Sequence, residues 1–243
     1  MTTIFPPRFT TPDHLPEELK AHGYALLAPS GVCKLTRSEL VELEALNLAW
    51  NDLPLDHYLK DGGRYRRRRH SCFVVNGSDV KQTPHRAHWQ PEEYNALHGG
   101  MKRLFEPIAP DTVARPVWQQ LLQSIADVCS EVAGKQPWYV EAHQFRIDTI
   151  DGIGRPTPEG AHRDGVDFVA LFLVDRKNVK GGESRIFEAA GSNGQRFTLI
   201  EPWTLLLLDD KRIIHESTPI QPTVEGGHRD SLVLTYRAKG FQE

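Results

Sequence analysis

The sequence predicts an α+β protein in which helices of the N-terminal half support a jelly-roll barrel formed by the C-terminal half. Before residue 137, apolar side chains recur at helical spacing. After it, short apolar or alternating runs follow one another between turn residues. At 243 residues, the chain also has the length of one large β-rich domain. We therefore expect one domain, with a helical part over about 1–136 and a jelly-roll core over about 137–243.

Three helices are predicted in the N-terminal half. Residues 12–20 form a short helix with apolar side chains on one face. Residues 36–39 read Thr-Arg-Ser-Glu, a capping-box pattern that predicts a helix from residue 40 to about residue 50. Residues 115–132 place apolar side chains at helical spacing, and Gly134 is the residue type that commonly follows a last helical turn.

Seven strands are predicted in the C-terminal half. Turns that contain glycine, such as Asp151-Gly152 and Gly226-Gly227, separate them. Many short strands at regular spacing favour a sandwich or barrel over a parallel sheet. The run 168–174 is apolar on both faces and is therefore expected inside the structure. The predicted strands cover residues 139–147, 168–174, 184–187, 196–200, 204–208, 212–217 and 231–236.

The composition argues against several classes of partner. With a formal net charge of −3 and a pI near 6.4, the overall charge favours neither nucleic acid nor an anionic membrane. The sequence has no apolar run of the roughly 18 residues that span a bilayer and no signal-peptide pattern at its start. Three widely spaced cysteines favour a reducing cytoplasm over a disulfide framework. We expect a cytoplasmic protein that acts on a small molecule, and its oligomeric state stays open.

Two His-x-Asp triplets offer candidate metal ligands, at residues 162–164 and 228–230. Residues i and i+2 of a strand share a face, so an imidazole and a carboxylate would form two-thirds of the facial triad that binds non-haem Fe(II). With 11 histidines and 32 acidic residues, roughly one such triplet is expected by chance. The triplet alone therefore decides nothing.

The position along the chain separates the two triplets. A third ligand must come from a later strand, after the sheet has folded back. A later predicted strand carries His215, whereas no histidine follows His228 in the sequence. We therefore predict that His162, Asp164 and His215 bind the metal, and we interpret residues 228–230 as a cluster of charges at the start of a strand.

The last predicted strand opens with Arg229 and Ser231 on one face. A guanidinium offers a bidentate fork to a carboxylate, and the neighbouring hydroxyl adds a third donor. These donors suit the distal carboxylate of 2-oxoglutarate, whose keto-acid end chelates a metal. The alternative is that Arg229 is an exposed arginine of a strand.

In this order, the His-x-Asp triplet, the distant histidine and the Arg-x-Ser pair resemble the 2-oxoglutarate/Fe(II) dioxygenases. The chain is also similar to one bacterial subfamily, the free L-isoleucine hydroxylases. The segments that carry this resemblance are EGAHRDGVDFVALFLV, GGESRIFE, LLLDDKRIIHESTPI and HRDSLVLTYR and, earlier in the chain, WNDLPLDHYL and YNALHGGMKRLFEPI.

The resemblance implies a double-stranded β-helix that uses Fe(II), 2-oxoglutarate and O₂, with its catalytic centre at His162, Asp164 and His215. It also implies hydroxylation of an unactivated C–H bond in a small molecule, a free aliphatic L-amino acid. Succinate and CO₂ would be released.

Gln144 and Arg146 share one face of the predicted strand before the metal motif, and His143 faces the other way. If the first face points inward, Gln144 is expected to contact the cosubstrate and Arg146 the substrate. If it points outward, both belong to the solvated side of the sheet. His143 is not expected to be a ligand. Asp210 is a typical turn residue, and support of His215 is its alternative role.

Residues 64–69 read Arg-Tyr-Arg-Arg-Arg-Arg and lead into an apolar strand. Such a run is usually a solvated basic face. Alternation puts Arg67 and Arg69 on one side of the strand, where one of them is expected to hold a substrate carboxylate. The expected substrate is isoleucine, leucine or methionine. The alternative is a larger or doubly charged molecule, such as an acylated amino acid, recognised with the help of His85 and His88.

Two other functions stay open. A non-catalytic jelly-roll protein would bind iron or 2-oxoglutarate as a sensor. A cupin-type dioxygenase would keep the metal but not use 2-oxoglutarate; such sites tend to use three histidines, so Asp164 and Arg229 argue against it. Release of succinate coupled to loss of 2-oxoglutarate distinguishes the dioxygenase from both alternatives.

Overall fold

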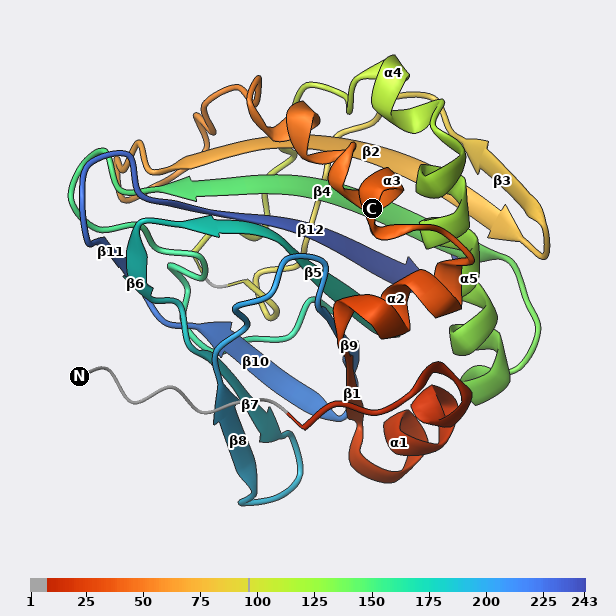
Figure 1. The fold of residues 1–243 in the computed structure, drawn as a ribbon. Coiled ribbons are helices and arrows are strands. Elements are labelled where there is room, and N and C mark those ends of the chain that lie inside the picture. The colour runs from red at the N-terminus through yellow and green to blue at the C-terminus, as the bar shows by residue number, and fades with distance from the viewer. Residues whose placement is uncertain (1–7, 96) are drawn as a thin grey trace.

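One antiparallel sheet organises the structure, a computed structural model that describes residues 8–95 and 97–243. Within these residues the strand order of this large sheet is β1-β9-β5-β12-β4-β2-β3, so strands from both halves of the chain lie side by side (Figure 1). Two smaller sheets, β10-β7-β8 and β11-β6, accompany it. The strands are β1 (Tyr24–Leu27), β2 (Arg66–Asn76), β3 (Asp79–Gln82), β4 (Trp138–Asp148), β5 (Phe168–Lys177), β6 (Val179–Gly181), β7 (Ser184–Glu188), β8 (Gly194–Phe197), β9 (Leu205–Asp209), β10 (Ile213–Ser217), β11 (Ile220–Pro222) and β12 (His228–Arg237).

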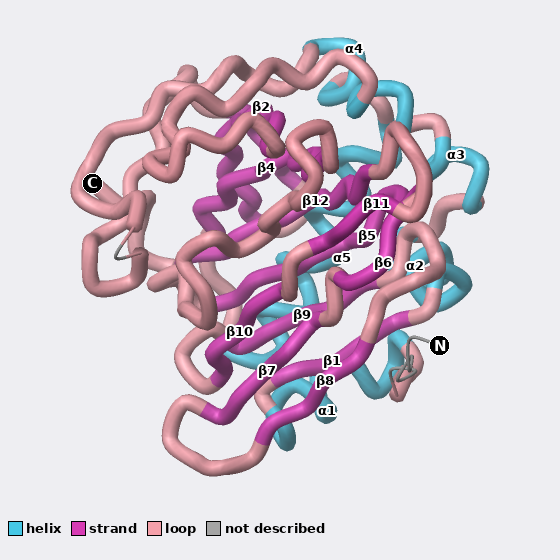
Figure 2. The backbone as a smooth tube through the Cα atoms, turned by 90° about the vertical axis from the view of Figure 1, so that its left-hand side faces the viewer, coloured by secondary structure: helices cyan, strands magenta, loops and turns pink. Residues whose placement is uncertain are grey.

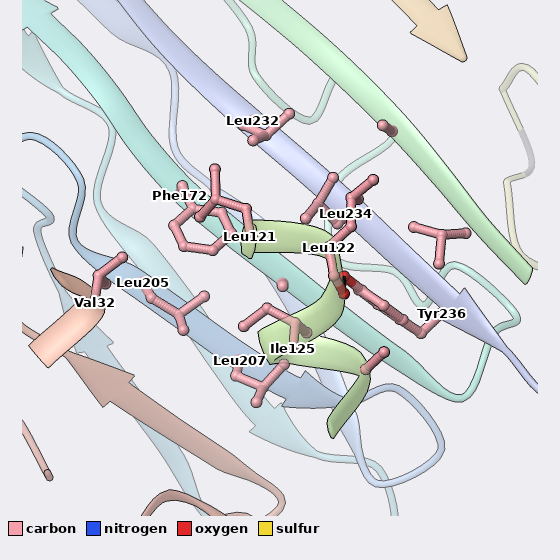
Figure 3. Packing of buried hydrophobic residues seen from close by; sticks show 14 of the residues in the cluster. Val32, Leu121, Leu122, Ile125, Phe172, Leu205, Leu207, Leu232, Leu234 and Tyr236 are labelled. Carbon is pink, nitrogen blue, oxygen red and sulfur yellow. Dashed lines mark hydrogen bonds between the residues drawn. The ribbon is translucent and has the colours of Figure 1, made fainter. Parts of the chain in front are cut away.

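Helix α5 covers the outer face of the large sheet, and Figure 2 shows the helices gathered on this side of the strands. Its apolar side chains recur every three or four residues, so Leu121, Leu122 and Ile125 all face the sheet. There they join Phe172 of β5 and Leu234 of β12 in one buried apolar core (Figure 3). The helical segments are η1 (Pro12–His14), α1 (Leu15–His22), α2 (Pro29–Thr36), α3 (Leu40–Glu44), η2 (Asn47–Trp50), α4 (Pro110–Val113) and α5 (Pro116–Ala133).

The inner face of the large sheet has two parts. One part packs against the three-stranded sheet, where Val169 and Leu206 meet Ile186 and Phe197 in a second apolar cluster. The other part lines a cavity together with residues of β10. The functional side chains described below lie in this second part.

Alternation along β12 assigns its side chains to the two faces of the sheet. Leu232 and Leu234 belong to the outer apolar core, whereas Arg229, Ser231 and Val233 line the cavity. One strand therefore contributes both to the core and to the site. A shift of its register by one residue would exchange the two sets.

The predicted strands of the C-terminal half and the last predicted helix of the N-terminal half are confirmed. All seven predicted strands overlap observed strands, and α5, followed by Gly134 with a φ of 92°, matches the helix predicted over residues 115–132. The N-terminal half adds β1, β2 and β3 to the large sheet. Across the described ranges, every helix is too short or too polar to span a bilayer.

The predicted capping box at residues 36–39 is wrong. Thr36 ends an additional helix, α2, and its hydroxyl donates to the carbonyl of Val32 within that helix (2.9 Å). A hydroxyl that is held in this way is not free to cap the next helix. The predicted helix over residues 40–50 is also interrupted, since α3 and η2 divide this segment between them.

We predict that Leu122→Ala lowers the free energy of unfolding by about 2–5 kcal/mol, because it leaves a cavity between α5 and the sheet where Leu122 is fully buried. The exposed Leu48, with 70% of its surface accessible, is the matched control. Leu48→Ala is expected to change stability by no more than about 0.5 kcal/mol. Chemical denaturation measures both values, and similar losses for the two variants would contradict the packing described here.

Candidate active site

The three predicted metal ligands meet in the cavity. His162 and His215 are joined by two backbone hydrogen bonds, each N–H donating to the other residue's carbonyl (3.0 and 2.9 Å). Their ring centroids are 4.7 Å apart. The Asp164 carboxylate faces both rings, with Oδ1 3.7 Å from His162 Nε2 and Oδ2 3.6 Å from His215 Nε2. This is the donor set of a facial triad for a divalent metal.

Hydrogen bonds from outside the triad orient two of its members. His162 Nδ1 donates to the carbonyl of Gly160 (3.0 Å), which directs Nε2 toward Asp164. Gln90 Nε2 donates to Asp164 Oδ1 (3.1 Å). The metal-facing atoms of these two residues are therefore held in place by the protein itself, and the residues present fit a bound metal ion.

The protonation of the ligands also indicates an affinity for positive charge. Burial acts to lower the pKa of His162, but the nearby Asp164 carboxylate, with the charge of Glu159, raises this pKa to about 10. Burial and the neighbouring His162 charge lower the pKa of His215 to about 4. Asp164 and His162 thus hold one proton between them, and a divalent cation would replace it.

Asp210 shapes the loop that carries Asp164. Its carboxylate accepts the backbone N–H groups of Asp164 (2.9 Å), Gly165 (2.8 Å) and Val166 (3.0 Å). Burial, together with the Asp164 charge, raises the pKa of Asp210 to about 7. The predicted alternative role of Asp210, support of His215, is thus replaced by support of the Asp164 loop.

Arg229 and Ser231 line the same cavity as the triad. Arg229 is 2% exposed, and among the described residues its Nε and Nη2 atoms have no hydrogen-bond partner. Burial, and after it the charge of Arg176, lowers its pKa to about 10, so the guanidinium stays charged at neutral pH. A buried charge without a partner is costly. Arg229 is therefore suited to an anionic ligand that enters the cavity.

The two polar residues singled out on β4 face away from the cavity. Gln144 is fully buried on the outer side of the sheet, and Arg146 donates to both oxygens of Asp230 (2.8 and 2.7 Å). His143 lines the cavity instead. Alternation therefore correctly placed Gln144 and Arg146 on one face of β4 and His143 on the other. The face that carries Gln144 and Arg146 points outward.

On strand β2, as on β4, the residues that face the cavity are the sequence neighbours of the predicted ones. Arg66 and Arg68 line the cavity, whereas Arg67 and Arg69 lie on the opposite face. There, Arg67 Nε lies 3.4 Å from a carboxylate oxygen of Asp148. The expectation that Arg67 or Arg69 contacts the substrate is therefore wrong. A period of two shows which residues share a face of the strand, but not which face turns inward.

A second group of ligand types lies beside the triad and was not foreseen. His70, His88, Glu141 and His143 place their donor atoms within 4.8 Å of one another. Glu141 Oε2 accepts from His70 (3.0 Å) and His88 (2.6 Å). Arg68 can only donate, and its Nη2 lies 2.7 Å from His143 Nδ1. His143 therefore carries its proton on Nε2, and this atom has no lone pair to offer a metal ion beside Glu141. We interpret this cluster as a buried carboxylate surrounded by imidazole rings.

The second His-x-Asp triplet also gathers three candidate groups, namely Asp175, His228 and Asp230. Arg146 already binds both oxygens of Asp230 and neutralises its charge. The triplet lies at the start of β12, as expected for a charge cluster.

The chain is similar to proteins of one family. The family model for 2OG-Fe dioxygenases matches residues 47–235. A crystal structure of a bsmA homolog from Methylobium petroleophilum PM1 is 46% identical, with a TM-score of 0.93, over 100% of this chain and 99% of that chain. Among curated proteins, no sequence matches this chain.

Two further solved structures share the fold at lower identity. IDO from Bacillus thuringiensis is 19% identical with a TM-score of 0.76, over 94% of this chain and 100% of that one. The Fe(II)/(alpha)ketoglutarate-dependent dioxygenase TqaL is also 19% identical, with a TM-score of 0.72, over 93% of this chain and 86% of that one. The antiparallel sheets of this chain match these jelly-roll neighbours.

We predict that Asp164→Ala abolishes tight binding of Mn(II), a probe for Fe(II), because only two imidazoles remain. Asp230→Ala, in the other triplet, should keep the affinity for Mn(II), although it lowers the melting temperature because Arg146 loses its buried partner. Titration of Mn(II) into both variants measures the affinities. Loss of Mn(II) in Asp230→Ala with retention in Asp164→Ala would show that the wrong triplet was chosen.

Proposed function

Since the chain belongs to the 2OG-Fe dioxygenase family, we propose that it hydroxylates an unactivated C–H bond of a small molecule, a free aliphatic L-amino acid. The family uses Fe(II), 2-oxoglutarate and O₂. In the proposed reaction, 2-oxoglutarate loses CO₂ and becomes succinate. One atom of O₂ enters the succinate, and the other enters the substrate as a hydroxyl group.

One observation carries the proposal: the His162, Asp164 and His215 triad and the buried Arg229 line the same cavity. A molecule with a chelating keto-acid group at one end and a carboxylate at the other suits these two features. In our proposal, the keto-acid end of 2-oxoglutarate binds at the triad. Its distal carboxylate accepts from Arg229 and Ser231, which share one face of β12.

Fe(II) bound by the triad supplies the activation of O₂ and the oxidation of the C–H bond. The chain's own residues bind and orient the two organic molecules. Val166, Leu171 and Val233 contribute apolar surface to the cavity, which suits an aliphatic side chain and disfavours water. The polar groups of the cavity then fix the orientation of the substrate.

The choice of a free amino acid is supported by the resemblance of six segments to the free L-isoleucine hydroxylases. Incubation with Fe(II), 2-oxoglutarate, ascorbate and single amino acids tests it, with mass spectrometry of the products. We expect succinate together with a product that has gained one oxygen atom. Binding of 2-oxoglutarate without succinate would favour a sensor, and oxidation without loss of 2-oxoglutarate would favour a cupin-type enzyme.

We predict that Arg229→Ala raises the KM for 2-oxoglutarate sharply while the affinity for Fe(II) changes little. Loss of one buried charged contact typically costs about 2–5 kcal/mol, a factor of 30 or more. Arg229→Lys should recover only part of this loss, because an ammonium group cannot form the bidentate fork. Steady-state kinetics with varied 2-oxoglutarate measure the effect, and a KM close to that of the unmodified protein in Arg229→Ala would refute the role.

A further inference from the structure

Arg103 is a buried cation of the cavity that the proposed binding of 2-oxoglutarate does not use. It lies in the segment between β3 and α4, where its backbone pairs with His88. Only 2% of the residue is exposed, and its Nη2 atom donates to Gln90 Oε1 (3.0 Å). Within the described segments, its Nε atom has no hydrogen-bond partner. Burial, and then the charge of Arg66, lowers the pKa of Arg103 to about 10, so it stays charged at neutral pH.

The other buried arginines of the cavity differ from Arg103 in having an acidic partner or an assigned ligand. Arg66 Nε donates to Asp56 Oδ2 (2.8 Å), and Arg68 Nη1 lies 4.0 Å from the same oxygen. Arg229 is assigned to 2-oxoglutarate. Arg103 is thus a second buried guanidinium, and an anion that enters the cavity would supply its missing ionic partner.

Gln90 connects Arg103 to the metal ligand Asp164. Its Oε1 atom accepts from Arg103 (3.0 Å) and from Asn95 Nδ2 (3.4 Å), while its Nε2 atom donates to Asp164 Oδ1 (3.1 Å). The amide orientation is fixed by chemistry, because an oxygen must face the two donors and an NH₂ group must face the carboxylate. An acid group bound at Arg103 is therefore held at a defined place relative to the metal.

Glu159 supplies the opposite charge in the same cavity. Its Oε1 atom lies 3.6 Å from His162 Nε2. Its Oε2 atom is buried and, in the part of the chain that the structure describes, has no hydrogen-bond partner. Arg103 and Glu159 both line the cavity, and the charge of Glu159 acts on Arg103. A ligand with one positive and one negative group would satisfy both side chains.

We propose that Arg103 and Glu159 bind the substrate as a zwitterion, with its carboxylate at Arg103 and its ammonium group at Glu159. This proposal rests on the function proposed above and deepens it, because it requires both charges of a free amino acid. An acylated amino acid lacks the ammonium group, and an amino acid amide lacks the carboxylate. Either would leave one buried side chain without its partner, which a site of this kind rejects.

Calorimetry with the Mn(II)- and 2-oxoglutarate-loaded protein tests the requirement for both charges. The ligands are L-leucine, L-leucinamide, which lacks the carboxylate, and 4-methylpentanoate, which lacks the amine. L-Isoleucine and L-methionine repeat the test with other side chains. We expect each singly charged analogue to bind more weakly than L-leucine by a factor of about 30 or more.

Two variants separate recognition from a merely structural role. Arg103→Gln should bind L-leucine and L-leucinamide about equally while still discriminating against 4-methylpentanoate. Glu159→Gln should show the reverse pattern. Arg67→Gln and Glu188→Gln, outside the cavity, are the matched controls and should keep both discriminations. A structural role would weaken all ligands alike and leave these ratios unchanged, which would overturn the proposal.

A melting curve adds a readout that does not depend on any ligand. Among the described residues, the buried Arg103 donates to the neutral Gln90 and its Nε has no hydrogen-bond partner, so Arg103→Gln removes a buried charge that no carboxylate neutralises by direct contact, and the variant should melt at the same temperature as the unmodified protein or higher. A clearly lower melting temperature would indicate that Arg103 serves the fold, and would count against the proposal.

The outcomes for the two proposals can be told apart. If the protein converts 2-oxoglutarate to succinate but binds N-acetyl-L-leucine as tightly as L-leucine, the zwitterion proposal fails and the dioxygenase stands. If the protein neither forms succinate nor binds 2-oxoglutarate, the proposed function fails, and the zwitterion proposal fails with it.

Discussion

The site depends on the two backbone hydrogen bonds between His162 and His215. They join the segment before β5, in the large sheet, to β10, in the three-stranded sheet. This bridge holds the two imidazole rings close together, with their centroids 4.7 Å apart. Asp210 then fixes the loop that follows His162, so that the Asp164 carboxylate faces both rings. Prearranged ligands of this kind lose little conformational entropy when a metal binds.

Burial of charge is the second constraint on this protein. Arg229 and Arg103 line the cavity with incomplete sets of partners among the described residues, and buried charges of this kind cost stability. The opposite face of the same sheet offsets this cost through the apolar core around α5. Stability and ligand recognition are thus assigned to opposite faces of β12 and β4. Buried charges whose partners are incomplete are typical of binding and catalytic centres.

The residues that the sequence predicted and those that it missed differ in where they lie. His162, Asp164, His215 and Arg229 stand on or next to strands, in an order along the chain that resembles the 2-oxoglutarate/Fe(II) dioxygenases. Gln90 and Arg103, which the sequence missed, lie in the long connection between β3 and α4, where no periodic pattern exists. His88 lies there too, and the sequence offered it only as a contact to a larger substrate. Their roles come from contacts with distant strands, such as that between His88 and Glu141 (2.6 Å). Local sequence carries no signal for contacts of this kind.

The sequence by itself predicted the seven C-terminal strands, helix α5 and the three residues of the candidate triad that the structure brings together, because each follows from a local period or from chain order. Only the tertiary structure decided which face of β2 and β4 turns inward. A period of two puts Arg66 and Arg68 on one face of the strand and Arg67 and Arg69 on the other. It does not show which of the two faces turns inward. Both sets are charged, so polarity does not distinguish them either. The inward face is set by the packing of α5 against the opposite side of the sheet, an interaction between segments far apart in the chain.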